Sequence, residues 1–103
     1  MKHSNILEKD DKQCGSDFFN ELSDKVNNKG EKIYFTFFSK EYYLDHTIEY
    51  DDGNYYSCAL YFRSVVDKEY CCMEVNCHEM YRLNDKNYID FNKFELHKGY
   101  LCF

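Results

Sequence analysis

The spacing of apolar positions changes once along the chain. Over residues 16–30 the apolar side chains recur at helical spacing and form a narrow stripe, which consists of Phe19, Leu22 and Val26. Ser16 is a suitable N-cap residue and Gly30 a natural stop, so the pattern predicts one helix over 16–30. From residue 31 onward apolar and polar residues alternate with a period of two, which is typical of β-strands.

The alternating runs predict a series of antiparallel strands. They cover residues 31–39, 42–50, 54–63 and the first part of 69–83. The run Asp51-Asp52-Gly53 predicts a hairpin with a three-residue loop. This register keeps one face apolar, pairing Ile48 with Tyr56, His46 with Cys58, Leu44 with Leu60 and Tyr42 with Phe62.

A second turn, near residues 65–68, predicts the next strand pair. A short loop there pairs Phe62 with Cys71, Leu60 with Met73 and Cys58 with Val75. Alternation fails at Glu79-Met80, where we expect a bulge or a second short hairpin, and residues 87–103 fit either a last strand or a short helix. We therefore predict an α+β domain over 16–103: one N-terminal helix packed on an antiparallel meander sheet of four to five strands. Residues 1–15 are polar and are predicted to form a loose arm.

Composition narrows the class of protein. The chain has 103 residues, 44% of them apolar, which suits one folded domain rather than a disordered segment. Its formal net charge of −6 disfavours direct nucleic-acid binding and favours a basic protein partner. Neither a signal peptide nor an apolar run long enough for a membrane helix is present, so we expect a cytoplasmic protein with reduced thiols and no membrane contact.

Residues 69–83, EYCCMEVNCHEMYRL, gather three of the six cysteines and one histidine. Alternation directs Cys71 and Cys77 toward the core, and Cys72 and His78 outward. Since Cys72 and Cys77 then diverge, we predict no zinc site, no other metal and no cofactor. The cysteines are interpreted as small core residues.

The predicted register offers one pair for thiol chemistry, Cys58 with His46, on the same apolar face. A small thiol enzyme or redox protein using this pair is therefore an alternative to a buried thiol beside a half-buried histidine. The chain has no phosphate-binding glycine loop, and its paired carboxylates lack a pocket. We accordingly predict that the protein is not an enzyme.

The outward positions of the predicted sheet combine tyrosines with carboxylates. Tyrosine brings a large rigid contact area and one polar group to an interface, so this face is the candidate binding surface. The candidate partner-binding residues are Tyr43, Asp45, Glu49, Asp51, Asp52, Tyr55, Tyr61 and Glu74.

The hairpin YYLDHTIEYDDGNYYSCALYF (42–62), with the small size and acidic charge of the chain, resembles small acidic phage proteins that inhibit bacterial defence, in particular anti-CRISPR proteins. The resemblance implies an inhibitor that occupies a Lys/Arg-lined channel of a nucleic-acid-handling enzyme, such as a CRISPR effector nuclease, in the host cytoplasm. An assembly or antitoxin-like subunit that binds a basic partner is the other binding hypothesis. If the run 31–39 lies at a sheet edge, its apolar character favours pairing into a homodimer.

Overall fold

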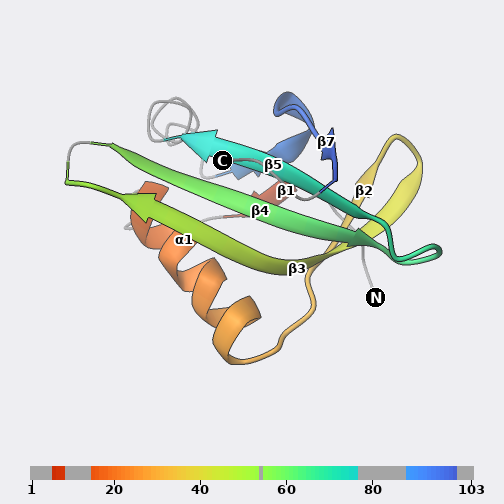
Figure 1. The fold of residues 1–103 in the computed structure, drawn as a ribbon, viewed down its shortest axis with the longest axis horizontal. Helices are drawn as coiled ribbons and strands as arrows, with labels where there is room; N and C mark the ends of the chain where they lie inside the picture. Colours follow the sequence, from red (N-terminus) through yellow and green to blue (C-terminus); the bar gives the residue numbers. More distant parts are fainter. Residues whose placement is uncertain (1–5, 9–14, 54, 77–87, 100–103) are drawn as a thin grey trace.

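The computed structural model describes residues 6–8, 15–53, 55–76 and 88–99 (Figure 1). Its helical elements are α1 (Gly15–Ser23), the π-helical turn η1 (Asp24–Asn28) and the 3-10 turn η3 (Phe91–Lys93). Its strands are β1 (Ile6–Glu8), β2 (Tyr34–Phe37), β3 (Lys40–Asp51), β4 (Tyr56–Ser64), β5 (Tyr70–Asn76), β6 (Tyr88–Asp90) and β7 (His97–Lys98).

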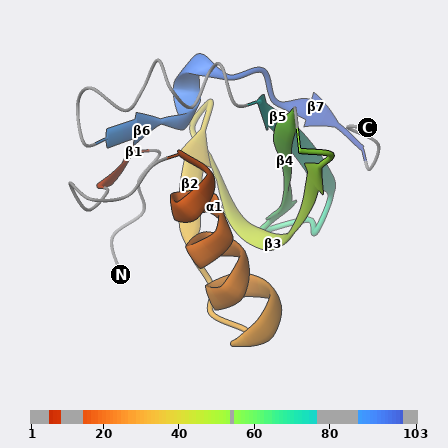
Figure 2. The ribbon, with the colours of Figure 1, turned by 90° about the vertical axis from the view of Figure 1, so that its left-hand side faces the viewer.

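Five of these strands form one antiparallel sheet in the order β2-β3-β4-β5-β7, and β1 pairs with β6 in a separate two-stranded sheet. Figure 2 shows that the large sheet is strongly bent and that α1 lies on its concave side. The predicted α+β class is therefore confirmed. The segment predicted as a loose arm contains the short strand β1, which local sequence did not indicate.

The helix forms where the apolar stripe predicted it. Phe19, Leu22 and Val26 are buried against the sheet, while the intervening side chains are exposed or half-buried. The last turn widens into η1, and Gly30 ends the segment with a φ of 67°. A left-handed φ costs glycine little, so Gly30 reverses the chain toward β2 without strain.

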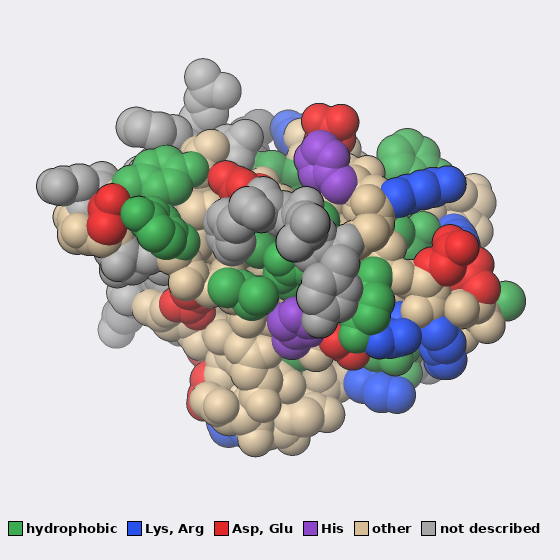
Figure 3. Space-filling model, in the orientation of Figure 1, with side chains coloured by type: hydrophobic (Ala, Val, Ile, Leu, Met, Phe, Trp, Pro, Cys, Tyr) green, Lys and Arg blue, Asp and Glu red, His purple; other side chains and the backbone are tan. Residues whose placement is uncertain are grey.

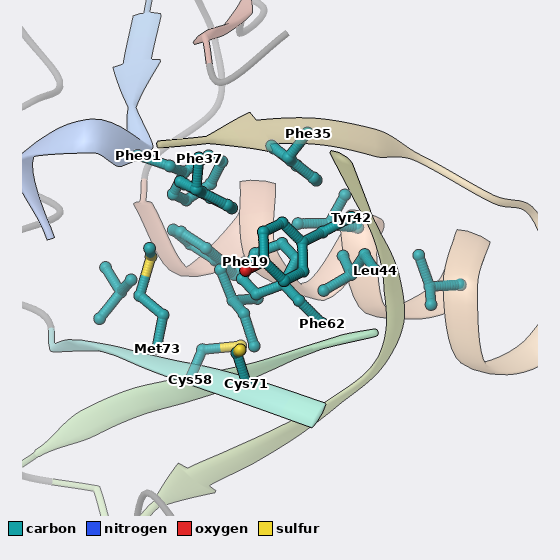
Figure 4. Close-up of a cluster of buried hydrophobic side chains, with 14 residues drawn as sticks. Phe19, Phe35, Phe37, Tyr42, Leu44, Cys58, Phe62, Cys71, Met73 and Phe91 are labelled. Carbon is teal, nitrogen blue, oxygen red and sulfur yellow. The ribbon is translucent and has the colours of Figure 1, made fainter. Parts of the chain in front are cut away.

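Aromatic rings fill the core between α1 and the sheet (Figure 4). The Phe62 ring lies edge-on to the rings of Phe35 and Phe37, with centroids 5.1 and 5.2 Å away. Phe91 of η3 closes this cluster from above, 5.3 Å from Phe35 and 6.3 Å from Phe19. Each fully buried phenylalanine contributes about 1.5–3 kcal/mol of transfer free energy, so these rings are the main source of stability.

The predicted register between β4 and β5 is confirmed. Phe62 lies opposite Cys71, Leu60 opposite Met73 and Cys58 opposite Val75. All six side chains are buried on the concave face. Cys58, Leu60 and Phe62 recur at every second position of β4, as Cys71, Met73 and Val75 do in β5, and this register brings the two sets together on one face.

The predicted register between β3 and β4 is wrong. A bulge between Leu44 and His46 shifts the pairing, and the hairpin loop comprises residues 52–55 rather than 51–53. Beyond the bulge Thr47 and Glu49 face the concave side, opposite Leu60 and Cys58. The bulged residue lets two neighbouring side chains oppose one, which reverses the alternation for the rest of β3.

Asn27 of η1 holds β3 just after this bulge. Its Oδ1 accepts a hydrogen bond from the Thr47 backbone N–H at 3.0 Å, and its Nδ2 donates to the Thr47 carbonyl at 3.1 Å and to Thr47 Oγ1 at 3.2 Å. The ladder between β2 and β3 ends at Tyr43, so the β3 backbone beyond it needs other partners. The Asn27 carboxamide supplies them and sets the orientation of Thr47.

The expectation of reduced thiols is wrong at Cys72, which is disulfide-bonded. Cys72 lies on the convex side as predicted, yet it is fully buried in a second small cluster with Ala59 and Tyr61. Cys58 and Cys71 are free thiols.

The remaining expectations concern the ends of the chain and of the sheet. Residues 87–103 contain both short strands and the η3 turn, while Glu79-Met80 and Cys77-His78 lie outside the described residues. Strand β2 is one edge of the large sheet, and its pairing into a homodimer stays a prediction. No helix of the described residues is long and apolar enough to cross a membrane.

Candidate functional site

The convex face of the sheet, which points away from α1, carries the candidate binding surface. Figure 3 shows hydrophobic and acidic side chains together at its left end, where Figure 1 places the β3–β4 hairpin. Lysine and arginine side chains gather toward the right end, near the β4–β5 turn. The two ends of one sheet face therefore differ in charge.

The left end forms a surface that we call the acidic aromatic patch. It consists of Ile48, Tyr50, Asp52, Tyr55 and Glu74. Its three large hydrophobic side chains are exposed to 45%, 49% and 37% in that order. Such exposure is unusual for side chains of this size when they lie next to one another, and it is typical of contact surfaces.

Hydrogen bonds connect the tyrosines of the patch to its carboxylates. The Tyr50 hydroxyl donates to Asp52 Oδ2 at 3.3 Å, and the Tyr55 hydroxyl lies 3.5 Å from Glu74 Oε1. The two tyrosine rings are 6.2 Å apart. Asp52 Oδ1 also accepts the Tyr55 backbone N–H at 2.8 Å, which holds the hairpin loop in shape. The patch is thus preorganised rather than a set of independent side chains.

The electrostatic potential of the patch is negative. The carboxylate of Asp52 repels the phenolate form of Tyr50 and accepts a hydrogen bond from its neutral form, and both effects raise the Tyr50 pKa above 10.0. Glu74 forms no ion pair with any described residue. A basic group that docks here would meet carboxylates backed by aromatic surface.

Toward the β4–β5 turn, the convex face carries a different arrangement around Asp45. One carboxylate oxygen lies 2.7 Å from His46 Nδ1 and accepts the Tyr70 hydroxyl at 3.4 Å. The other lies 3.8 Å from Arg63 Nε, and the Arg63 guanidinium stacks over the Tyr70 ring at 3.8 Å from its centroid. Asp45 was expected to face solvent as an acidic contact. Instead it is half-buried, and its charge is compensated locally.

Two of the tyrosines that were expected to contact a partner instead contact other residues of this chain. Tyr61 is only 3% exposed, and its ring stacks on His46 with centroids 4.6 Å apart. Tyr43 is half-buried between two lysines, with Lys32 Nζ 4.8 Å and Lys68 Nζ 5.5 Å from its ring centroid. These lysines come from the chain before β2 and from the β4–β5 turn, so strand alternation could not place them here.

Three of the eight expected residues therefore come together in the patch: Asp52, Tyr55 and Glu74. Glu49 is exposed, but the bulge turns it toward the concave side. The side chain of Asp51 is not among those that the structure describes. Sequence reasoning missed Ile48 and Tyr50, which it placed in the core. The available signal was the polar pair Asp45-His46 within an apolar run, a pattern compatible with a bulge.

The structure separates the pair proposed for thiol chemistry. Cys58 lies on the concave face opposite Glu49, whereas His46 lies on the convex face opposite Tyr61. Burial raises the Cys58 pKa far above its usual 9.0, and repulsion from the Glu49 carboxylate raises it further. The group therefore stays a thiol at neutral pH. A Cys58–His46 nucleophile cannot form in this fold.

Metal-binding groups do not converge in the described part of the chain, where no three His, Cys, Asp or Glu side chains gather. The sequence hypothesis of a zinc site also needed Cys72, whose sulfur is committed to a disulfide. Comparison of the chain with protein-family models, with curated proteins and with solved structures found no match.

Proposed function

We propose that the protein is a binding protein that inhibits its partner by docking the acidic aromatic patch onto a basic surface. The observation that carries the proposal is the patch itself: Ile48, Tyr50 and Tyr55 exposed beside the carboxylates of Asp52 and Glu74. Exposed aromatic side chains supply contact area, and carboxylates supply charge complementarity and faster association.

The partner we propose is a nucleic-acid-handling enzyme of bacterial defence, such as a CRISPR effector nuclease. Such enzymes bind nucleic acid in Lys/Arg-lined channels, which a carboxylate-bearing surface can occupy in place of phosphate. The net charge of −6 and the resemblance of the 42–62 hairpin to small anti-CRISPR proteins support this choice. An inhibitor of such an enzyme has to act in the cytoplasm. There the Cys72 disulfide would be exposed to reducing conditions.

The proposal is tested with the double variant Asp52→Lys/Glu74→Lys. The purified protein is mixed with a panel of CRISPR effector nucleases, and target DNA binding and cleavage are measured at two salt concentrations. The wild type is expected to inhibit one of them, and the double reversal to weaken inhibition by at least about 100-fold, because close interfacial charge pairs carry several kcal/mol.

A matched control is Glu31→Lys/Glu95→Lys, which changes the same number of exposed carboxylates away from the patch. Both double variants change the net charge from −6 to −2, so a general charge effect would weaken inhibition equally in the two. Inhibition that survives reversal of the patch would refute the docking mode. Binding of a nuclease without inhibition would favour an assembly subunit instead.

A further inference from the structure

A pocket of about 300 Å³ opens at the end of the sheet opposite the acidic aromatic patch. It lies between the β2–β3 turn, the start of β5 and the segment around β7. The residues that form its floor are Phe37, Tyr42, Cys71 and Leu96, and Phe38 and Lys98 stand at its rim. A volume of this size is at the lower end of the range for small-molecule sites.

The floor of the pocket is the outer end of the hydrophobic core. Phe37, Tyr42 and Cys71 belong to the buried cluster of Figure 4 and are only 2%, 7% and 6% exposed. Leu96 is partly buried and packs against the same cluster. Burial raises the pKa of both the Tyr42 hydroxyl and the Cys71 thiol, so both groups stay neutral at the floor of the pocket. This floor favours a ligand whose body is aromatic or aliphatic.

Phe38 at the rim has an unfavourable backbone conformation. Phe38 and Ser39 form the two-residue β2–β3 turn with φ values of 50° and 63°, in positions that asparagine and glycine normally occupy. The Phe38 side chain is 92% exposed, so it gains almost no packing in return for this strain. Strained residues of this kind are typical of sites that clamp a ligand. A bound ligand would give the ring a surface to cover.

The two lysines that line the pocket, Lys40 and Lys98, differ in whether an anionic side chain of the protein already pairs with them. Lys40 Nζ is held by Asp67 at 2.8 Å and lies 4.0 Å from the carboxylate of Glu69, which also lines the pocket. Lys98 forms no hydrogen bond or ion pair with any described residue, and its charge acts on the Cys71 thiol at the pocket floor. Lys98 is therefore the group that can receive an anionic ligand atom.

From these observations we infer that the pocket binds a small organic carboxylate with an aromatic or aliphatic body. The body lies on Phe37, Tyr42 and Leu96, the carboxylate pairs with Lys98, and the Phe38 ring closes over the ligand. This site is independent of the acidic aromatic patch, so either can fail without the other.

The probe is 4-phenylbutyrate, titrated into the full-length ¹⁵N-labelled protein, with the uncharged 4-phenylbutan-1-ol as its analogue. Saturable amide shifts are expected in the β2–β3 turn and around β7. The alcohol and the variant Lys98→Gln should each weaken binding roughly tenfold, the loss of one charge-assisted hydrogen bond. Lys29→Gln, an exposed lysine at the end of η1, is the matched control and should leave the affinity unchanged.

Phe38→Gly separates a clamping role from a structural one. Because glycine accepts a left-handed φ, this variant should melt at a higher temperature than the wild type and yet bind 4-phenylbutyrate several-fold more weakly. Val66→Ala removes another exposed apolar side chain, outside the pocket, and should change neither quantity. Absence of saturable shifts, equal binding of the alcohol, or unchanged affinity in both Lys98→Gln and Phe38→Gly would overturn the proposal.

Discussion

The two ends of the convex sheet face contain the same kinds of residues and differ in how these residues are paired. Toward the β4–β5 turn, the Asp45 carboxylate meets Arg63, His46 and the Tyr70 hydroxyl. Toward the β3–β4 hairpin, the carboxylates of Asp52 and Glu74 meet tyrosine hydroxyls. The net charge of each part of the surface therefore depends on which side chains lie near its carboxylates in space, and not on the number of carboxylates along a strand.

The bulge in β3 creates this difference. Tyr43 before the bulge and Asp45 within it lie among lysine and arginine side chains from other segments. After it, the reversed alternation brings Ile48 and Tyr50 to the convex face and turns Glu49 away. One additional residue in one strand thus decides which aromatic side chains reach the patch.

The largest effect on stability is expected from Asn27→Ala, because Asn27 holds β3 just after the bulge that makes the two ends differ. The substitution removes three hydrogen bonds to Thr47 and leaves part-buried polar groups unsatisfied, so the free energy of unfolding should fall by about 2 kcal/mol. Chemical denaturation measures this loss, and amide exchange should accelerate at Thr47. Asn28→Ala is the control and should cost far less, because among the described residues the Asn28 side chain bonds Asp24 alone, in an exposed position.

Replacing Arg63 by methionine should make the Asp45 end resemble the acidic end. The Asp45 carboxylate would lose its cation, and Tyr70 would lose its stacked guanidinium, at a cost of about 1 kcal/mol for groups that remain partly exposed. A double-mutant cycle with Asp45→Asn measures the coupling. If the stability losses of the two single variants simply add in the double variant, Arg63 does not compensate the charge of Asp45. The two ends would then not differ in the way described.

Acid should affect the cationic end through Asp67. A hydrogen bond from Lys40, followed by one from the Glu69 backbone N–H, lowers the Asp67 pKa from 3.8 to about 2. Because the pKa is lower in the folded state, its stabilising contribution is complete above pH 3.8 and is lost as the pH falls toward 2. The stability difference between the wild type and Asp67→Asn, measured by denaturation, should shrink across that window. A difference that stays constant with pH would contradict the Lys40 contact.

The smallest effect is expected at the acidic end, in the titration of Tyr50. Since Asp52 raises the Tyr50 pKa above 10.0, Asp52→Asn should bring it back toward that value with little change in stability. NMR titration of the tyrosine ring measures the pKa. Glu74→Gln, which changes a carboxylate bonded to the other tyrosine, should leave the Tyr50 value nearly unchanged.

Whether a segment keeps its regular periodicity decided which parts of the fold could be predicted. The stripe through Phe19, Leu22 and Val26 and the pairing of Phe62 with Cys71 were correct, because the periodicity there is uninterrupted and brings these side chains together in the core. Strand β3 alternates just as regularly in sequence, with aliphatic residues on one face and carboxylates on the other, but the bulge after Leu44 reverses this alternation partway along the strand. Its register was therefore predicted incorrectly, and with it the positions of Ile48 and Tyr50.

By itself, the sequence determined the helix, the succession of antiparallel strands, the β4–β5 register and a surface rich in tyrosine and carboxylate. These features depend on neighbours close in the chain or on one strict alternation of apolar positions. Tertiary contacts alone determined the bulge after Leu44, the burial of Cys72 with Ala59 and Tyr61, the cations around Asp45 and the pocket beside Phe38. Each of these requires contact between segments far apart in sequence, and local alternation carries no information about such contacts.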